Sequence, residues 1–222
     1  MLEIACFEIT SAEIALNSCA DRIEFCKELE LGGTTPDIEE FIYLKEHYQK
    51  PIFVMIRPRG GNFFYSDAEF EQMKKDIIVF KNEGADGFVF GILNSQKEID
   101  IERNKQLVEL AGNIPCTFHR AFDRTPDIFG SLNTLIKIGF KTVLTSGGEK
   151  SALEGAENLH QLIQQSNGEI DILIGGGVRS NNLKNIKEKT KGTSFHSSAI
   201  LKYELFANPD EIIKLKEYSA IP

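Results

Sequence analysis

Several residue types and patterns are scarce or missing in this sequence. It has no tryptophan, three methionines and four cysteines, and no two cysteines form a C-x-x-C pair. That absence excludes a zinc ribbon and a thioredoxin-like redox motif. The first residues include glutamates instead of a basic segment, so we expect no signal peptide and a cytoplasmic protein with free thiols. No apolar run approaches the length that crosses a bilayer.

Positive charge is also scarce, because 25 lysines and arginines stand against 33 acidic residues, for a net charge of −8. An acidic chain is a poor ligand for polyanions, so we expect neither nucleic acid nor an anionic membrane as the main partner. The P-loop signature is absent, which argues against nucleotide hydrolysis. None of the lysines lies inside a predicted strand, so a Schiff-base mechanism is not expected.

Short apolar segments recur along the chain, separated by segments with helical periodicity. Their starts lie roughly 20 to 36 residues apart, which suits one strand, one helix and two loops. Polar residues follow nearly every strand, and eight units exceed the five or six of a doubly wound open sheet. We therefore predict an α/β fold, a single-domain TIM (β/α)8 barrel over residues 1–222. The predicted strands are residues 2–7, 22–26, 52–56, 87–93, 117–122, 142–146, 171–174 and 194–197.

Capping residues predict several helix ends. Ser66 and Glu69 form a capping box that opens a helix, and Gly84 ends it. Thr35 followed by proline predicts the start of another helix. Ser180 is expected to cap the helix that follows the seventh strand.

The stretch CTFHRAFDR at residues 116–124 begins as a strand and ends in a cluster of charged and polar side chains. Such groups are costly to bury unpaired, but they suit the C-terminal rim of a barrel, where working residues gather. We predict Glu24, His119 and Asp123 as the residues that transfer protons. The alternative is that His119 only joins a structural hydrogen-bond network.

Five of the seven arginines follow the third, fifth and seventh predicted strands, and glycine-rich loops follow the sixth and seventh. Arginine forms bidentate pairs with carboxylate or phosphate, and glycine lets backbone N–H groups approach an oxyanion. The alternative is that arginines such as Arg124 and Arg179 pair with Glu8, Glu24 and Asp123 to hold the barrel mouth. The predicted anion-binding residues are Arg57, Arg59, Arg120, Ser146, Gly147, Gly148, Gly176, Gly177, His196 and Ser197.

A metal ion is a further option. Glu8, Glu24, His119 and His196 are chemically able to ligate a divalent cation. Cys6 and Cys26, on neighbouring strands with Met55 nearby, are candidates for a soft copper site. Against this, free cysteines in strands often serve as small buried apolar residues.

Several long motifs resemble those of the CutC family, over residues 4 to about 200. Phe25 and Phe88 depart from the aliphatic residues expected there, which should affect packing only. The resemblance implies a cytoplasmic TIM barrel, a homodimer or larger homo-oligomer, and a role in copper tolerance and homeostasis. The motifs are ADRIEFC at 20–26, LGGTTP at 31–36, MIRPRGG at 55–61, FYS at 64–66, GADG at 84–87, TFHRAFD at 117–123, LTSGG at 144–148 and HSSA at 196–199.

Two main hypotheses follow. One is cytosolic copper handling, with the ion bound through Cys6 and Cys26. The other is an enzyme that acts by acid–base chemistry on a small anionic metabolite, such as a phosphorylated one, held by the arginines and glycine loops. A barrel that serves only as an interaction scaffold is the third reading.

Overall fold

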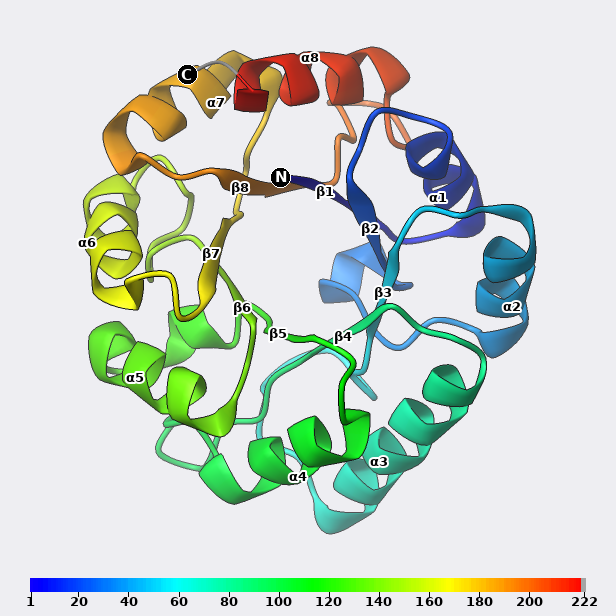
Figure 1. Ribbon diagram of the computed structural model, residues 1–222, viewed down its shortest axis with the longest axis vertical. Coiled ribbons are helices and arrows are strands. Elements are labelled where there is room, and N and C mark those ends of the chain that lie inside the picture. Colours follow the sequence, from blue (N-terminus) through cyan, green and yellow to red (C-terminus); the bar gives the residue numbers. More distant parts are fainter. Residues whose placement is uncertain (221–222) are drawn as a thin grey trace.

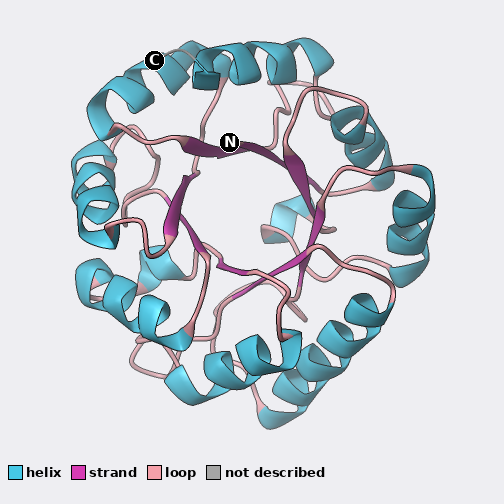
Figure 2. Cartoon of the chain, in the orientation of Figure 1, coloured by secondary structure: helices cyan, strands magenta, loops and turns pink. Residues whose placement is uncertain are grey.

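Eight parallel strands form a closed barrel, and the helices surround it (Figure 1, Figure 2). The computed structural model describes residues 1–220, and β8 pairs with β1 to close the ring. The predicted TIM barrel is therefore confirmed. The strands are β1 (Leu2–Cys6), β2 (Arg22–Phe25), β3 (Ile52–Met55), β4 (Gly87–Phe90), β5 (Cys116–Phe118), β6 (Thr142–Thr145), β7 (Asp171–Ile174) and β8 (Ser194–Ser197).

Each strand is followed by a helix, as the alternating pattern predicts. No helix among residues 1–220 is both long and apolar enough to cross a membrane. The α-helices are α1 (Ile9–Leu16), α2 (Ile38–His47), α3 (Asp67–Asn82), α4 (Ile101–Ala111), α5 (Ile128–Ile138), α6 (Ala156–Ser166), α7 (Ser180–Thr190) and α8 (Pro209–Ala220), and the short 3-10 helices are η1 (Leu29–Leu31) and η2 (Phe122–Arg124).

Alternate residues of each strand face opposite sides of the barrel wall. In β1, Leu2, Ile4 and Cys6 belong to the large apolar core, whereas Glu3 and Ala5 do not. Glu3 instead sits beside Arg22 of β2 and His196 of β8, its partners in register. The outward-facing strand residues therefore form an apolar layer under the helices, and charged residues such as Glu3 lie inside the barrel.

An aromatic ring fills part of that interior below the charged residues. A side chain at Gly87 of β4 would lie 2.4 Å from the Phe53 ring, so the glycine makes room for the ring. The Arg22 guanidinium stacks over the same ring at 3.9 Å from its centroid. Phe53, Met55, Val89 and Cys26 form a small apolar cluster separate from the main core.

Some predicted element ends hold and others move. The Ser66–Glu69 capping box is present at the start of α3. Helix α2 starts later than predicted, with Asp37 at its N-cap, because the Thr35 hydroxyl accepts the Arg57 N–H instead. Arg179, not Ser180, precedes α7, and the Ser180 hydroxyl donates to Glu211.

The fifth strand is shorter than predicted. It ends at Phe118, and the chain then turns into η2 at Phe122. The turn is held by the Phe122 N–H, which donates to the His119 carbonyl. As a result the charged residues of the stretch lie on a loop over the barrel mouth.

Candidate functional site

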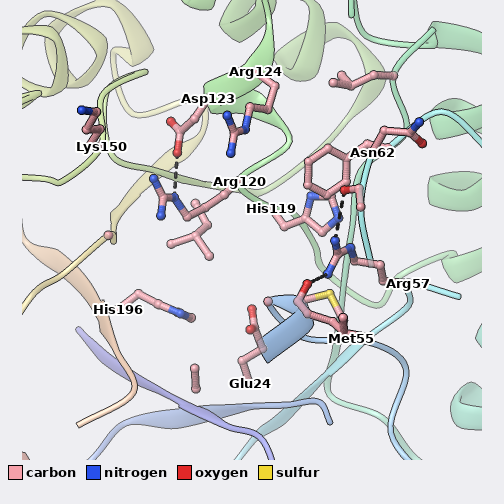
Figure 3. A pocket seen from close by; sticks show the side chains of 18 of the residues that line it. Glu24, Met55, Arg57, Asn62, His119, Arg120, Asp123, Arg124, Lys150 and His196 are labelled. Carbon is pink, nitrogen blue, oxygen red and sulfur yellow. Dashed lines mark hydrogen bonds and ion pairs between the residues drawn. The ribbon is translucent and has the colours of Figure 1, made fainter. Parts of the chain in front are cut away.

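A cavity of about 1180 Å³ opens at the C-terminal ends of the strands (Figure 3). Every strand or its following loop contributes to its lining, which is the arrangement expected of a TIM-barrel active site. The contributions, in chain order, include Phe7, Glu24, Arg57, Leu93, His119, Gly148, Gly176 and His196.

A buried charge cluster adjoins the cavity, and two of its members, Glu24 and His196, line it. The Arg22 Nε atom lies 2.5 Å from Glu3 Oε2, and His196 Nδ1 lies 2.7 Å from Glu3 Oε1. Glu24 adds a second carboxylate, with donor atoms of Glu3, Glu24 and His196 all within 4.8 Å of one another. Glu3 is saturated by its two partners, whereas Glu24 Oε2 is buried with no hydrogen-bond partner in residues 1–220.

This environment brings the pKa of Glu24 into the neutral range. Burial raises the pKa of Glu24 to about 7, with the Glu3 carboxylate adding to the rise and His196 and Arg22 opposing it. The pKa of His196 is raised by Glu24 and Glu3, although burial acts in the opposite direction. Glu24 can therefore take up or release a proton near pH 7, with His196 close by.

His119, on the opposite side of the cavity from His196, has a different character. Burial, aided by the positive charge of Arg57, lowers the pKa of His119 to about 3. The Ala121 N–H donates to His119 Nδ1, so the neutral ring carries its proton on Nε2, which has no partner within the described chain. Gly91 makes room for the ring, since a side chain there would lie 2.8 Å from it. His119 is thus a neutral hydrogen-bond donor at pH 7. Its predicted part in proton transfer stays a prediction.

Arg57 lines the cavity, but most of its donors are already occupied. Its Nη1 atom donates to the carbonyls of Leu31 and Gly33, at 2.8 and 2.6 Å, and Nη2 lies 3.4 Å from the Gly61 carbonyl. The guanidinium also packs against the Phe63 ring, 5.1 Å from its centroid. Arg57 therefore fixes the loops after β2 and β3.

Arg59 is not among the residues that line the cavity. It pairs with Glu69 of α3 at 2.5 Å and also donates to the carbonyl of Phe64. Its place fits the structural alternative for the arginines, in which they hold the barrel mouth together.

Asp123 binds the loop after β6. Its carboxylate accepts the N–H groups of Ser146 and Gly148, both at 3.1 Å, and the Thr145 hydroxyl. It also accepts Arg120 Nε at 2.7 Å. The glycine loop that was predicted to hold a substrate anion therefore holds the chain's own carboxylate, and Asp123 acts as a positioning residue for Arg120.

Replacing Asp123 with Asn is expected to lower the free energy of unfolding by about 2–4 kcal/mol at pH 7, because an amide NH₂ would face buried donors. Chemical denaturation measures the change. Asp127→Asn is the matched control, since Asp127 caps α5 and Asn caps equally well. Equal stability of the two variants would contradict the network.

Several donors remain free on this side of the cavity. Arg120 Nη1, the Arg124 guanidinium and the Lys150 ammonium have no partner in the part of the chain that the structure describes. The same holds for the N–H groups of Gly176 and Gly177. Gly176 lies against Arg120, since a side chain there would come within 3.3 Å of the guanidinium carbon.

The remaining predicted residues lie around these donors. Gly147 donates its N–H to the Thr145 hydroxyl, which leaves it unavailable to a ligand. The Ser197 hydroxyl donates to the Val178 carbonyl and accepts Arg179 Nη1. Glu8 caps α1, accepting the N–H groups of Thr10 and Ser11.

Comparison with known proteins agrees with the resemblance in the sequence. The CutC family model matches residues 1–201. This chain belongs to the CutC family. The human copper homeostasis protein cutC homolog is 46% identical over 199 residues, covering 90% of this chain and 73% of the relative.

Solved structures agree with the family and the fold. The crystal structure of CutC from Streptococcus agalactiae superposes with a TM-score of 0.84 at 33% identity, covering 89% of this chain and 98% of that one. N-(5′-phosphoribosyl)anthranilate isomerase from Pyrococcus furiosus shares the fold at a TM-score of 0.61 and 13% identity, covering 99% and 98%.

The family's association with copper raises the question of which residues could hold that ion. Cys6 pairs in register with Phe25, and Cys26 follows one residue later, so the two side chains face opposite sides of the barrel wall. Cys6 lies in the main core and Cys26 in the small interior cluster. Burial raises the pKa of both thiols well above the usual value, which disfavours the thiolate that binds copper. The structure does not bring these two sulfurs together.

Sequence reasoning missed three residues of the site: Glu3, Arg22 and Lys150. Glu3 and Arg22 could have been found from strand parity, because Glu3 alternates with the apolar Leu2 and Ile4 and must point inward. Lys150 gave no such signal, because it lies beyond a glycine loop whose path the sequence does not specify.

Proposed function

We propose that this member of the CutC family is an enzyme that transfers a proton on a small anionic metabolite, with Glu24 as the acid–base group. The observation that carries the proposal is the place of Glu24. Glu24 lines the cavity, one oxygen of its carboxyl has no protein partner, and its pKa is raised to about 7. A group with that pKa both takes and gives a proton at neutral pH.

Other groups around the cavity support the same chemistry. His196 lies beside Glu24 and can share its proton. His119 offers a neutral N–H donor that can polarise a carbonyl without giving up its proton. Arg120, Arg124 and Lys150 supply the positive charge that an anionic substrate needs.

Exchange of carbon-bound hydrogen for deuterium tests the proposal without knowledge of the product. The protein is incubated in D₂O with a panel of keto and aldehyde phosphates and carboxylates, and loss of C–H signal is followed by NMR. Wild type should exchange at least one compound, and Glu24→Gln should slow that exchange by about 100-fold or more.

Lys214→Ala is the control for this assay, because Lys214 is an exposed residue of α8 outside the cavity lining and its loss should leave the rate unchanged. Exchange that persists in Glu24→Gln would overturn the role of Glu24. No exchange with any compound of the panel would count against proton transfer itself.

Copper binding is the second candidate, and it rests on the family together with one cluster. Glu3, Glu24 and His196 offer carboxylate and imidazole donors within 4.8 Å of one another. Such donors suit Cu(II) better than Cu(I), whereas Arg22 already supplies a positive charge to Glu3 and would oppose a cation.

Titration with Cu(II) and with Cu(I) under anaerobic conditions tests this candidate. If the cluster binds copper, His196→Gln should abolish Cu(II) binding while Cys26→Ser leaves it intact. Loss of binding in Cys26→Ser alone would instead favour the cysteine site.

A cytoplasmic location and a homodimer complete the proposal. The four free cysteines, three of them buried, support a reducing compartment. The dimer stays a prediction from the family, and sedimentation of the purified chain would test it.

A further inference from the structure

The cavity has two walls of opposite chemistry. Loops after β5, β6 and β7 form what we call the cationic wall, made of Arg120, Arg124, Lys150, Gly176 and Gly177. Loops after β2, β3 and β4 form the apolar wall, made of Leu29, Leu31, Phe63, Phe64 and Leu93. In Figure 3, Arg120, Arg124 and Lys150 lie across the cavity from Met55 and Arg57, with Glu24 and His196 toward the lower side of the view.

The cationic wall has unused capacity for an oxyanion. Arg120 is held by Asp123 and by the Ser146 hydroxyl, 2.6 Å from Nη2, so its Nη1 is fixed in place and free. Arg124 and Lys150 have no partner among residues 1–220. Glu149 and the saturated Asp123 are the carboxylates that line the cavity here, so positive charge remains in excess.

The apolar wall exposes more hydrophobic surface than a purely polar ligand would need. Leu29, Leu31 and Phe64 are 48%, 43% and 51% exposed, although they line a cavity. Clustered apolar residues at the rim of a cavity are typical of ligand contact. Asn62, Asn94 and Lys97 add polar groups to this side.

Two buried polar atoms lie within the same cavity lining. Glu24 is 3% exposed and His119 is 4% exposed, and each has a side-chain atom without a protein partner. The volume of about 1180 Å³ exceeds what a three- or four-carbon phosphate fills. A small sugar phosphate would leave the apolar wall in contact with water.

We propose that the substrate is amphipathic: a phosphate or carboxylate group bound at the cationic wall, joined to a planar ring or unsaturated body that packs on the apolar wall. The atoms between these two parts then lie over Glu24 and within reach of the His119 N–H. This assignment of substrate class rests on the proposed proton-transfer function for its chemistry, but its binding test is independent of that function.

The test compares the affinities of inorganic phosphate, methyl phosphate, cyclohexyl phosphate and phenyl phosphate by calorimetry. Phenyl phosphate should bind about tenfold tighter than methyl phosphate, because the ring buries apolar area against Phe63 and Phe64. Cyclohexyl phosphate has the bulk of phenyl phosphate without its planar ring, so its affinity should lie between those of methyl and phenyl phosphate. Comparing the affinity of phenylacetate with that of phenyl phosphate distinguishes a carboxylate head group from a phosphate head group.

Variants assign each part of the ligand to its wall. Phe64→Ala should reduce the preference for the phenyl group to about twofold. Phe206 is also an exposed phenylalanine but lies outside the lining, so Phe206→Ala should leave the preference unchanged. Arg124→Ala should lower the affinity for every phosphate by a similar factor, about tenfold, whereas Lys214→Ala on α8 should lower none of these affinities.

Equal affinity for methyl and phenyl phosphate would overturn the proposal, as would a phenyl preference that survives Phe64→Ala. The results also distinguish failure of the substrate-class proposal from failure of the proton-transfer proposal. If binding follows the pattern and no deuterium exchange is found, the substrate class stands and the reaction is wrong. If only ring-free anions exchange, the reaction stands and the substrate class is wrong.

Discussion

Replacing Glu24 with Gln is expected to stabilise the protein at pH 9 by about 3 kcal/mol, even though it should remove activity. The folded protein holds the Glu24 carboxyl in a buried site where its pKa is about 7, against an ordinary value of 4.5. The gap between those values corresponds to about 3 kcal/mol of unfavourable ionisation in the folded state. Gln keeps the shape of the neutral acid and avoids that cost.

The pH dependence identifies the cause. Below pH 4.5 the carboxyl is neutral in both states, so the two proteins should differ little. Between pH 4.5 and 7 the folded protein keeps a proton that the unfolded chain has released, so wild-type stability falls as the pH rises. The advantage of Glu24→Gln should therefore grow across that window and level off above it.

Chemical denaturation at a series of pH values measures this effect. Glu217→Gln on α8 is the matched control, because Glu217 is exposed and should show no such growth. A difference between Glu24→Gln and wild type that does not vary with pH would show that Glu24 ionises normally, and would remove the main support for its acid–base role.

The fold could be predicted because it depends on a repeated local pattern. Apolar strands, capped helices such as the one at Ser66, and short loops recur eight times, and a closed parallel barrel satisfies all of them. The strand ends also predicted that Glu24, His119 and His196 would line one cavity.

The roles of individual site residues could be predicted less well, because a role depends on which donors are left unpaired. Arg57, Arg59 and Asp123 have the chemistry of ligand-binding groups, but their partners are loop carbonyls, Glu69 and the N–H groups after β6. Those pairings follow from the three-dimensional course of the loops. The spacing of residues in the sequence does not specify the course of the loops. A structural arginine and a ligand-binding arginine therefore look alike in the sequence.

His119 yields the second large effect, and its sign is the reverse of that of Glu24. The pKa of His119 is lowered to about 3 from an ordinary 6.5, chiefly by burial. The unfolded chain takes up a proton below pH 6.5 and the folded protein does not, so this residue makes wild type less stable as the pH falls. The loss should amount to about 1.4 kcal/mol per pH unit, reaching about 5 kcal/mol near pH 3.

His119→Gln is expected to lose stability at pH 7, because the ring packs against Phe63 with centroids 4.8 Å apart. Its disadvantage relative to wild type should then shrink as the pH falls from 6.5. His47→Gln, at an exposed histidine of α2, serves as control and should show no comparable trend. A constant deficit in His119→Gln would mean that the folded protein protonates His119 readily.

Between pH 4.5 and 6.5 the two residues act in opposite directions, so their contributions to the pH dependence of wild-type stability nearly cancel. Each single variant should uncover the slope of the other, and the double variant should restore a profile parallel to that of wild type in this window. The cancellation arises because the cavity buries a carboxyl and an imidazole in their neutral forms. That is the state in which Glu24 can donate a proton and His119 can donate a hydrogen bond to the same bound molecule.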